Sequence, residues 1–343
     1  MYLHALATAA PPTKFTPLQC WDLAQRSGVR SRLSRRSMLV LHSILRSDHG
    51  IDTRHFAVAD VDRVFDLGAD ELNHAFRREA PALAARALTA ALDRASLRPA
   101  DIDALLICTC TGYLCPGVTS YVSEQLGLRP NAFLQDLVGL GCGAAIPTLR
   151  AASHLAASQP AAVIACVAVE ICSAAFYLDD DPGVLISACL FADGAAATLW
   201  RGTPGPHALR AFDFDTLHRP GDRDKLRFEQ RDGKLRNLLH RTVPELAASA
   251  VGELWQRRGP RPVARVITHP GGRDVLEAIA PVVAPHSLAA SAATLRAHGN
   301  MSSPSVLFVL ERTLRDELPT AAGDFWLASF GAGFSAHSCR IGL

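Results

Sequence analysis

Aromatic residues and lysine are both scarce in this chain of 343 residues. Aromatic side chains make up only 6% of it, so the 49% of hydrophobic residues are mainly Ala, Leu and Val. Lys+Arg 35 against Asp+Glu 33 leaves a formal net charge of +2. Because neither sign dominates, the composition argues against a general binder of nucleic acid or of membrane surfaces. The apolar fraction excludes a disordered chain, and the length predicts about two domains.

The nine cysteines include no Cys-x-x-Cys pair, and several of them lie in apolar runs. In a chain of this length, that usage predicts reduced thiols in the cytosol rather than a disulfide scaffold. No ligand spacing is typical of zinc, so no metal is expected. We therefore expect a cytoplasmic protein.

No apolar run fits a membrane span or a signal peptide. The longest run, 161–178, carries Glu170 at its centre, which favours a buried strand that leads into a loop. The start MYLHALATAAPP has no positive residue ahead of its short apolar part, so a signal peptide is not expected.

Strand-like and helix-like segments alternate along the chain. Apolar strands are expected at 102–110, 161–169, 190–199, 263–268 and 324–330, and helices at 80–95, 114–126, 144–158, 243–255, 274–280 and 304–317. Such strands are typical of a sheet covered by helices on both faces. Each half of the chain holds one such series, which predicts two related α/β halves, 1–204 and 205–343, divided at a Pro/Gly cluster. The charged run 219–234 is expected to be a solvated excursion.

Cys142 lies where an apolar run turns into a helix, in the sequence LGCGAA. Glycines on both sides permit a sharp turn. A thiol at a helix N-terminus feels the positive end of the helix dipole, which favours the thiolate. Cys142 is therefore a candidate nucleophile, although most cysteines of this kind are small buried hydrophobes.

Two further polar residues stand next to glycines at the ends of expected elements. His269 follows the strand 263–268 and precedes Pro-Gly-Gly, at the end of a strand where α/β sheets form ligand crevices. Asn300 lies in HGNMSSP just before a helix, a place typical of a turn or an N-cap. Together with Cys142 they supply a nucleophile and two polar groups able to hold an oxyanion.

The order Cys, His, Asn also occurs in papain-like hydrolases. Those enzymes carry a Trp soon after the Cys, whereas Gly-Ala-Ala-Ile follows Cys142 here. A Cys-His-Asn hydrolase therefore remains an alternative of a different class, with the wrong sequence around its nucleophile.

Several segments resemble the signature segments of type III polyketide synthases, the chalcone and stilbene synthase family. They are TCTGYLCPGVTSYVSEQLGLRP, GLGCGAA, VAVEICSA, LFADGAAATLW, THPGGRDVLEAI, HGNMSSPSVLFVLE and SFGAGFSAH, between about residue 100 and residue 336. The combination of HPGG with GNMSS is specific to the family, whereas GCG alone would not be.

The resemblance implies an α/β thiolase fold, with two similar α/β halves in a five-layer αβαβα arrangement, and a cytoplasmic homodimer. It implies an acyltransferase of secondary metabolism that uses CoA thioesters and no cofactor. Cys142 would carry the acyl starter and the growing chain. His269 and Asn300 would bind the malonyl-CoA thioester and stabilise the enolate left by decarboxylation. Phe191 matches the family's gatekeeper Phe, whose apolar face would favour loss of CO2.

Positions that line the family's cavity differ in this chain. Thr positions fall on Cys110, Cys172 and Ala175, a Gly position falls on Phe228, and the second gatekeeper Phe falls on Asn237. The neighbour-contacting Met position falls on Cys115, and Ser302 and Gly331 lie in the last two motifs. We expect all eight to bind substrate. Cys110 and Ala175 are no bulkier than Thr, and no bulky aromatic replaces the second gatekeeper Phe, which favours a long fatty acyl starter. The family resemblance implies a pyrone, resorcinol or related phenolic product.

A ketoacyl-ACP synthase III shares the fold and the Cys-His-Asn set and is the nearest alternative. HPGG in place of that family's usual His-Gln-Ala-Asn argues against it. The basic residues that contact CoA in the family do not map cleanly, and Arg32, Arg35, Arg36 and Arg46 are candidates by charge only. We expect no nucleic-acid partner and no membrane span.

Overall fold

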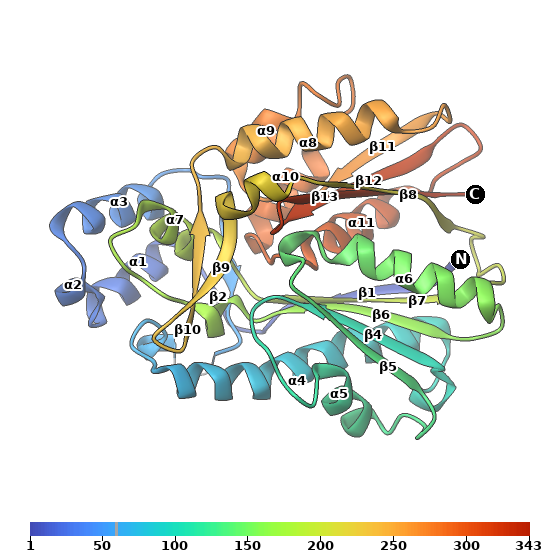
Figure 1. Ribbon diagram of the computed structural model, residues 1–343, viewed down its shortest axis with the longest axis horizontal. Helices are drawn as coiled ribbons and strands as arrows, with labels where there is room; N and C mark the ends of the chain where they lie inside the picture. Colours follow the sequence, from blue (N-terminus) through green and yellow to red (C-terminus); the bar gives the residue numbers. More distant parts are fainter. Residues whose placement is uncertain (59–60) are drawn as a thin grey trace.

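The structure is a computed structural model that describes residues 1–58 and 61–343. Nine strands of the described residues form one sheet with the order β11-β12-β13-β8-β1-β7-β6-β4-β5. The strands are β1 (Tyr2–Ala9), β4 (Ala104–Thr109), β5 (Phe133–Val138), β6 (Ile164–Glu170), β7 (Gly194–Arg201), β8 (Arg210–His218), β11 (Val263–Thr268), β12 (Asp324–Gly331) and β13 (Ser335–Gly342). Because β1 and β8 pair at a single residue pair, Tyr2 with Arg210, the sheet splits into two layers (Figure 1).

Helices fill the space between these two layers and cover their outer faces (Figure 1). The central helices α6 (Ala145–Ser158) and α11 (Ser305–Asp316) contact strands of both layers, and α10 (Ala289–His298) packs along α11. Helices α4 (Ala69–Ala95) and α5 (Val118–Leu126) cover one outer face, and α8 (Val243–Arg257) and α9 (Arg273–Ile279) cover the other. The arrangement is αβαβα, the five layers that the family resemblance implied.

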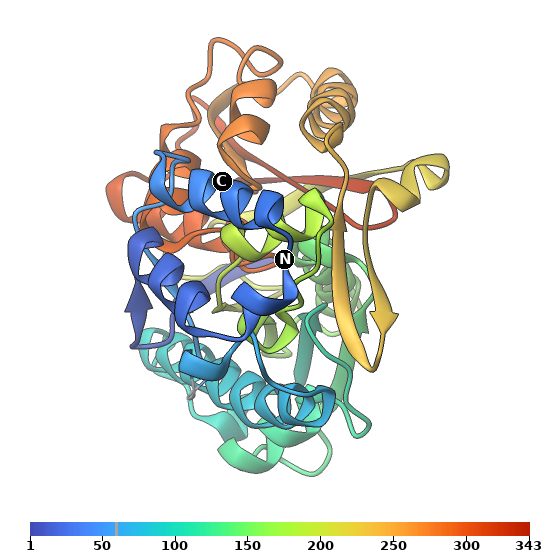
Figure 2. The same ribbon diagram turned by 90° about the vertical axis from the view of Figure 1, so that its left-hand side faces the viewer.

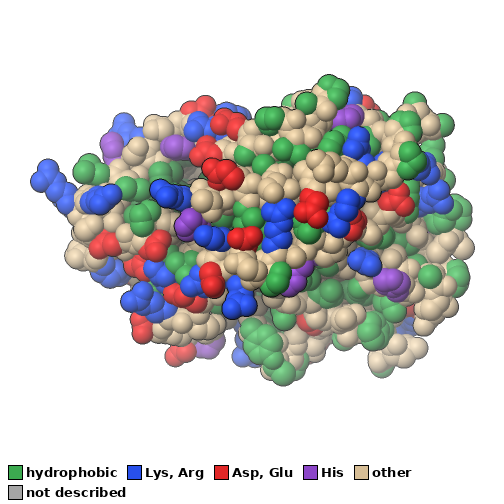
Figure 3. All heavy atoms as spheres, turned by 45° about the horizontal axis from the view of Figure 1, so that its top comes forward, with side chains coloured by type: hydrophobic (Ala, Val, Ile, Leu, Met, Phe, Trp, Pro, Cys, Tyr) green, Lys and Arg blue, Asp and Glu red, His purple; other side chains and the backbone are tan. Residues whose placement is uncertain are grey.

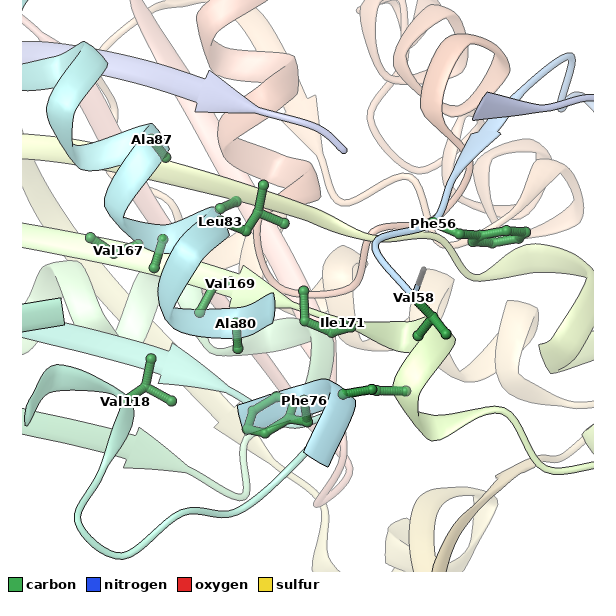
Figure 4. Packing of buried hydrophobic residues seen from close by; sticks show 14 of the residues in the cluster. Phe56, Val58, Phe76, Ala80, Leu83, Ala87, Val118, Val167, Val169 and Ile171 are labelled. Atoms are coloured by element: carbon green, nitrogen blue, oxygen red, sulfur yellow. The ribbon is translucent and has the colours of Figure 1, made fainter. Parts of the chain in front are cut away.

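The interface between α4 and the sheet shows how an alanine-rich chain builds its core. Every residue of β6 is buried, so both faces of this strand must be covered. Figure 4 shows Ala80, Leu83 and Ala87 of α4 directed toward Val167 and Val169 of β6. The small alanine side chains let the helix backbone approach the sheet closely, while each buried Leu or Val stabilises the fold by about 1.5–3 kcal/mol.

A lobe at one side of the layers is built from the N-terminal helices α1 (Pro17–Arg26), α2 (Val29–Arg32) and α3 (Arg35–Arg46), together with α7 (Pro182–Leu190). The short strands β2 (Lys14–Phe15) and β3 (Arg54–His55) connect it to the body. A separate hairpin, β9 (Leu226–Arg231) and β10 (Lys234–Leu239), runs alongside this lobe (Figure 2). Strand β10 packs against α7, so the hairpin connects the C-terminal part of the chain to the lobe.

All eleven strands and helices expected from the sequence are present, with ends shifted by a few residues for most and by about one turn or more for α4 and α5. The charged run 219–234 is largely exposed, as expected for a solvated excursion, with Leu226 as its one buried residue. Its second part forms β9, which has an inward face and a charged outer face because side chains alternate along a strand. The division into halves 1–204 and 205–343 remains a prediction.

Acidic and basic side chains are interspersed on the face shown in Figure 3, as the balanced composition requires. In the described part of the chain, no helix combines the length and apolar character needed to cross a membrane. The same residues contain no group of three or more His, Cys, Asp and Glu placed to hold a metal ion. All nine cysteines are free thiols.

Candidate active site

Cys142 occupies a 3-10 turn, Gly141–Gly143, between strand β5 and helix α6. Gly141 has a φ of +56°, which glycine adopts without strain. Gly331 lies against the same turn, and a Cβ there would come within 2.6 Å of the Gly143 nitrogen and 2.8 Å of the Cys142 nitrogen. Glycine at both positions therefore allows the end of β12 to pack directly on the backbone of the nucleophile turn.

The Cys142 thiol is buried, and burial raises its pKa to about 12. The Ser302 hydroxyl donates to its Sγ at 3.2 Å and lowers the pKa only in part. This corrects the expectation that the helix dipole keeps Cys142 as a thiolate, because desolvation of the charged sulfur is the larger effect. Burial also lowers the pKa of His269 to about 3, so the imidazole is neutral. The resting pair is a neutral thiol and a neutral imidazole.

His269 follows β11, and its backbone N–H donates to the carbonyl of Ala328 at 2.8 Å. Its ring meets Phe330 edge-on, with the ring centroids 5.3 Å apart. The Nδ1 atom is buried and has no hydrogen-bond partner within the described residues. His269 is therefore held by its backbone and by ring packing rather than by a hydrogen bond of Nδ1.

Asn300 is held by two hydrogen bonds of its side chain. Its Oδ1 accepts from the backbone N–H of Ser302 at 2.8 Å, and its Nδ2 donates to the carbonyl of Gly271 at 3.0 Å. An amide nitrogen carries two hydrogens, so one donor of Asn300 remains available. Helix α11 begins only at Ser305, so Asn300 is not its N-cap.

Phe191 is joined to Asn300 by an isolated β-bridge. The N–H of Ala192 donates to the Asn300 carbonyl at 2.8 Å, and the N–H of Asn300 donates to the Leu190 carbonyl at 3.0 Å. Arg54, only 2% exposed, donates to the Phe191 carbonyl at 3.0 Å from the other side. The tertiary structure thus places Phe191 beside Asn300, although more than a hundred residues separate them in sequence.

Three spaces lie around the turn that carries Cys142, and successive ones share lining residues. The first, here called the inlet, has a volume of about 450 Å³ and is lined by Cys142, Phe191, His269 and Asn300, with α3 forming one wall. The second, the constriction, has only about 20 Å³ and is lined by Cys110, Cys142, Cys172, Phe191, Phe228, Asn237 and Ser302 among others. The third, the outer cavity, has about 770 Å³ and shares Cys110 and Phe228 with the constriction. The structure therefore brings together ten of the twelve predicted site residues, with Gly331 packed behind Cys142.

The remaining two residues, Cys115 and Ala175, line none of these spaces. Ala175 is buried in the 3-10 turn Cys172–Ala175, and its neighbour Ala174 lines the outer cavity instead. The turn rotates by about 120° per residue, so adjacent side chains face different ways. Cys115 is exposed on the loop before α5. None of Arg32, Arg35, Arg36 and Arg46 lines the inlet, whose basic residues besides His269 are His49, His240, Arg241 and Arg273.

Glu170, which sequence reasoning did not assign to the site, lies behind the constriction. Its buried carboxylate accepts hydrogen bonds from Thr109, Cys110, Thr111, Ser302 and Ser303. Burial raises its pKa above the ordinary value. In the sequence, the one signal for this role was a lone carboxylate at the centre of an apolar run. A carboxylate that accepts several buried hydrogen bonds explains its position there.

The comparisons with known proteins agree with this geometry. A family model described as FAE1/type III polyketide synthase-like protein matches residues 62–208. A 3,5-dihydroxyphenylacetyl-CoA synthase of Amycolatopsis orientalis is 30% identical over 75% of this chain and 72% of its own length. A 1,3,6,8-tetrahydroxynaphthalene synthase of Streptomyces coelicolor is 29% identical over 96% of this chain and 89% of its own.

Solved structures extend the likeness to the whole fold. The crystal structure of the tetrahydroxynaphthalene synthase from Streptomyces coelicolor, described as a bacterial type III polyketide synthase, superimposes with a TM-score of 0.87 at 26% identity. It covers 99% of both chains. A polyketide synthase structure from the brown alga Ectocarpus siliculosus has the same fold, with a TM-score of 0.88 at 23% identity over 99% of this chain and 97% of its own. These superpositions confirm the predicted fold class.

Proposed function

The chain belongs to the type III polyketide synthase family, and from that membership we infer that Cys142, His269 and Asn300 carry out its condensation reaction. The enzyme is an acyltransferase of this family, rather than a ketoacyl-ACP synthase III or a Cys-His-Asn hydrolase. The observation that carries the assignment of residues is that all three side chains line one cavity, the inlet. The substrates that we propose are an acyl-CoA starter and malonyl-CoA, with no further cofactor.

Loading of the starter begins from the neutral thiol and imidazole. As the Cys142 sulfur attacks the thioester carbonyl, the thiol proton passes to His269, the neutral imidazole that lines the same cavity. The bond between the carbonyl carbon and the CoA sulfur breaks, and the CoA thiolate takes the proton from the imidazolium. The acyl group is then held on Cys142, and His269 is neutral again.

Malonyl-CoA enters by the same inlet. The free N–H of Asn300 and a ring N–H of His269 donate to its thioester oxygen, where negative charge develops as the bond to the carboxylate breaks and CO2 leaves. The enolate carbon attacks the acyl carbonyl on Cys142, a carbon–carbon bond forms, and the cysteine sulfur leaves. Phe191 gives the site an apolar wall, which disfavours the charged carboxylate more than the spread charge of the transition state.

The outer cavity supports a long acyl starter. Leu72, Phe76, Val138, Ala174 and Leu235 give it apolar walls, so methylene groups of an extended chain leave water there. The relatives are named for hydroxylated aromatic products, tetrahydroxynaphthalene and 3,5-dihydroxyphenylacetyl-CoA. We therefore keep a pyrone, a resorcinol or a related phenolic as the product class.

Strand β5 supports a homodimer. It is the last strand of the sheet, so one of its edges is unpaired, and Phe133, Leu134 and Val138 are exposed on it. An apolar, unpaired edge is a template for a second strand. The exposed Cys115 belongs to a loop that packs beside this edge, since Gly117 contacts Asp136 of β5. A contact of Cys115 with the second copy would explain why it lines no cavity of its own chain.

The experiment that tests the function uses the purified protein with malonyl-CoA and acyl-CoA starters of increasing length, with mass spectrometry of the products. We expect Cys142→Ala to lose condensation but to continue to release CO2 from malonyl-CoA. Asn300→Ala should lose decarboxylation by about 100-fold, the usual effect of one oxyanion donor. Asn131→Ala, a matched change at an exposed amide that lines none of the three spaces, should decarboxylate like the wild type. Wild-type rates for Asn300→Ala would reduce Asn300 to a turn residue.

A further inference from the structure

One face of the β9–β10 hairpin follows the whole path from the inlet to the outer cavity. The cross-strand pairs are Leu226 with Leu239, Phe228 with Asn237, and Gln230 with Leu235. The first pair lines the inlet, the second lines the constriction, and the third lines the outer cavity. Because side chains alternate along a strand with a period of two, these six share one face of the hairpin. The middle pair lies where a chain attached to Cys142 must pass.

The other face of the hairpin is tied down by Arg236. Its guanidinium, in a residue only 9% exposed, donates to Asp179 at 2.7 Å, to Asp181 at 3.4 Å and to Glu229 at 2.9 Å. Asp179 and Asp181 lie in the loop that leads into α7. These contacts of Arg236 fix strand β10 from its outer face. The inward-facing side chain of the next residue, Asn237, is therefore not needed to keep the strand in place.

Asn237 carries an unsatisfied polar atom into the constriction. The residue is 8% exposed, and its Oδ1 is buried without a hydrogen-bond partner among the described residues. A buried polar atom without a partner costs free energy, and such atoms are rare in folded proteins. Its neighbours across the narrow space are Phe228, Cys172, Ser302 and the nucleophile Cys142. The amide is therefore placed to meet a group of the chain that Cys142 carries.

We propose that Asn237 binds the enolised β-dicarbonyl of the growing chain and so decides between lactonisation and carbon–carbon ring closure. The proposal rests on the proposed function, which supplies a poly-β-keto chain on Cys142. An enolised β-dicarbonyl presents an O–H donor and a carbonyl acceptor side by side. A primary amide presents a carbonyl acceptor and N–H donors in the same spacing, so one side chain satisfies both groups of the chain.

Lactonisation is the step that this contact would suppress. In it, an enol oxygen of the chain attacks the thioester carbonyl, a carbon–oxygen bond forms, and the carbon–sulfur bond to Cys142 breaks. The enol proton passes to the leaving sulfur, and the product is a pyrone. An enol oxygen that donates to Asn237 is held away from the thioester. The chain then survives for further extension and for attack by carbon, which yields a phenolic ring.

The test is the product ratio of Asn237→Leu, a change of similar size that removes both hydrogen-bonding groups. One hydrogen bond corresponds to a factor of about 3–10 in a ratio of rates. With malonyl-CoA and any starter that the wild type accepts, the ratio of pyrone to phenolic product should therefore rise by that factor. Starter loading on Cys142 and decarboxylation of malonyl-CoA are measured in the same variant, so that a lower overall rate is separated from a shift in the product ratio. Asn237→Ser, which restores a donor and an acceptor, should return the ratio part of the way.

Leu238→Ala is the matched control, because Leu238 is half-buried on the opposite face of the same strand and should leave the product ratio unchanged. Thermal unfolding separates a binding role from a structural one. Removal of an unsatisfied amide should leave the Tm of Asn237→Leu equal to that of the wild type or higher. An unchanged product ratio in Asn237→Leu, with loading intact, would overturn the proposal. A wild-type protein that makes no polyketide at all would instead overturn the proposed function.

Discussion

The hydroxyl of Ser302 lies 3.2 Å from the sulfur of Cys142 and 3.3 Å from the sulfur of Cys110. The two thiols therefore share one hydroxyl group, and that group also lies 3.3 Å from the carboxylate of Glu170. Ser302 has a φ of +59°, a conformation that is uncommon for residues other than glycine. A strained serine at this point ties the nucleophile to the buried acid behind it.

Loss of this hydroxyl should slow the nucleophile. We expect Ser302→Gly to lower the rate of Cys142 acylation by starter CoA by about tenfold, the scale of one hydrogen bond to a charged group. Glycine relieves the strain of the positive φ, whereas Ser302→Ala loses the same hydroxyl and keeps the strain that serine already carries. Rapid-quench acylation followed by intact-mass measurement checks both variants. An unchanged rate in Ser302→Ala would show that the hydroxyl does not assist the nucleophile, and an effect in Ser302→Gly alone would assign the defect to the backbone.

The cysteines should be alkylated in an order set by burial. Cys115 is the only exposed thiol, so brief iodoacetamide treatment at neutral pH should label it first. Cys142, with a pKa of about 12, should react slowly at pH 7 and faster as the pH rises toward 10. Peptide mapping after timed treatment gives the order, and Cys115→Ala should abolish the fast phase. Fast labelling of Cys142 at neutral pH would show that its thiolate is stabilised in solution.

Starter length should depend on Ala174 rather than on Ala175. Ala174 lines the outer cavity, so Ala174→Leu should lower kcat/KM for long starters and spare acetyl-CoA. Each buried CH2 that is lost costs about 0.8 kcal/mol, or roughly a factor of four. Ala175→Leu is the matched change one residue further along, and it should overpack the core at a cost of about 1–3 kcal/mol in stability. Its ratio of long to short starters should equal that of the wild type.

Stability should fall in mild acid because buried histidines are held neutral. Burial lowers the pKa of His269 to about 3 and that of His337 to about 4, both from 6.5. Between the pKa of the folded state and 6.5, the unfolded state binds more protons than the folded state. The free energy of unfolding therefore drops by about 1.4 kcal/mol per pH unit for each histidine as the pH falls below 6.5. Asp193 acts in the opposite sense, since burial raises its pKa to about 7 from 3.8 and its protonation favours the folded state in acid.

Urea unfolding at pH 7, 6 and 5 measures this balance. As the pH is lowered from 7 to 5, the free energy of unfolding should fall in the wild type and should fall less steeply in His337→Gln. His337 bonds only to the hydroxyls of Thr216 and Ser335 among the described residues, so glutamine can replace it in part. A profile that is identical in the two proteins would mean that His337 titrates normally in the folded state.

The positions of Cys142, His269 and Asn300 beside sharp turns could be predicted from sequence because each stands in a local motif. Glycine on both sides of Cys142, Pro-Gly-Gly after His269 and Gly before Asn300 all mark sharp backbone turns at the ends of strands or helices. Apolar runs such as 164–170 likewise predict buried strands without knowledge of their partners. Each of these signals lies within a few neighbouring residues, so it can be recognised without knowledge of the fold.

The tertiary structure alone decided how those residues behave. The pKa of Cys142 depends on burial by segments far away in sequence, so the local helix dipole predicted its direction wrongly. The hydrogen-bond donors to Glu170 come from residues 109–111 and 302–303, and no sequence pattern around Glu170 itself indicates them. The charged run 219–234 also contributes Leu226, Arg227 and Phe228 to the walls of the constriction, which its charge pattern does not indicate. Burial and long-range contact set these properties, and neither is encoded in any short stretch of the chain.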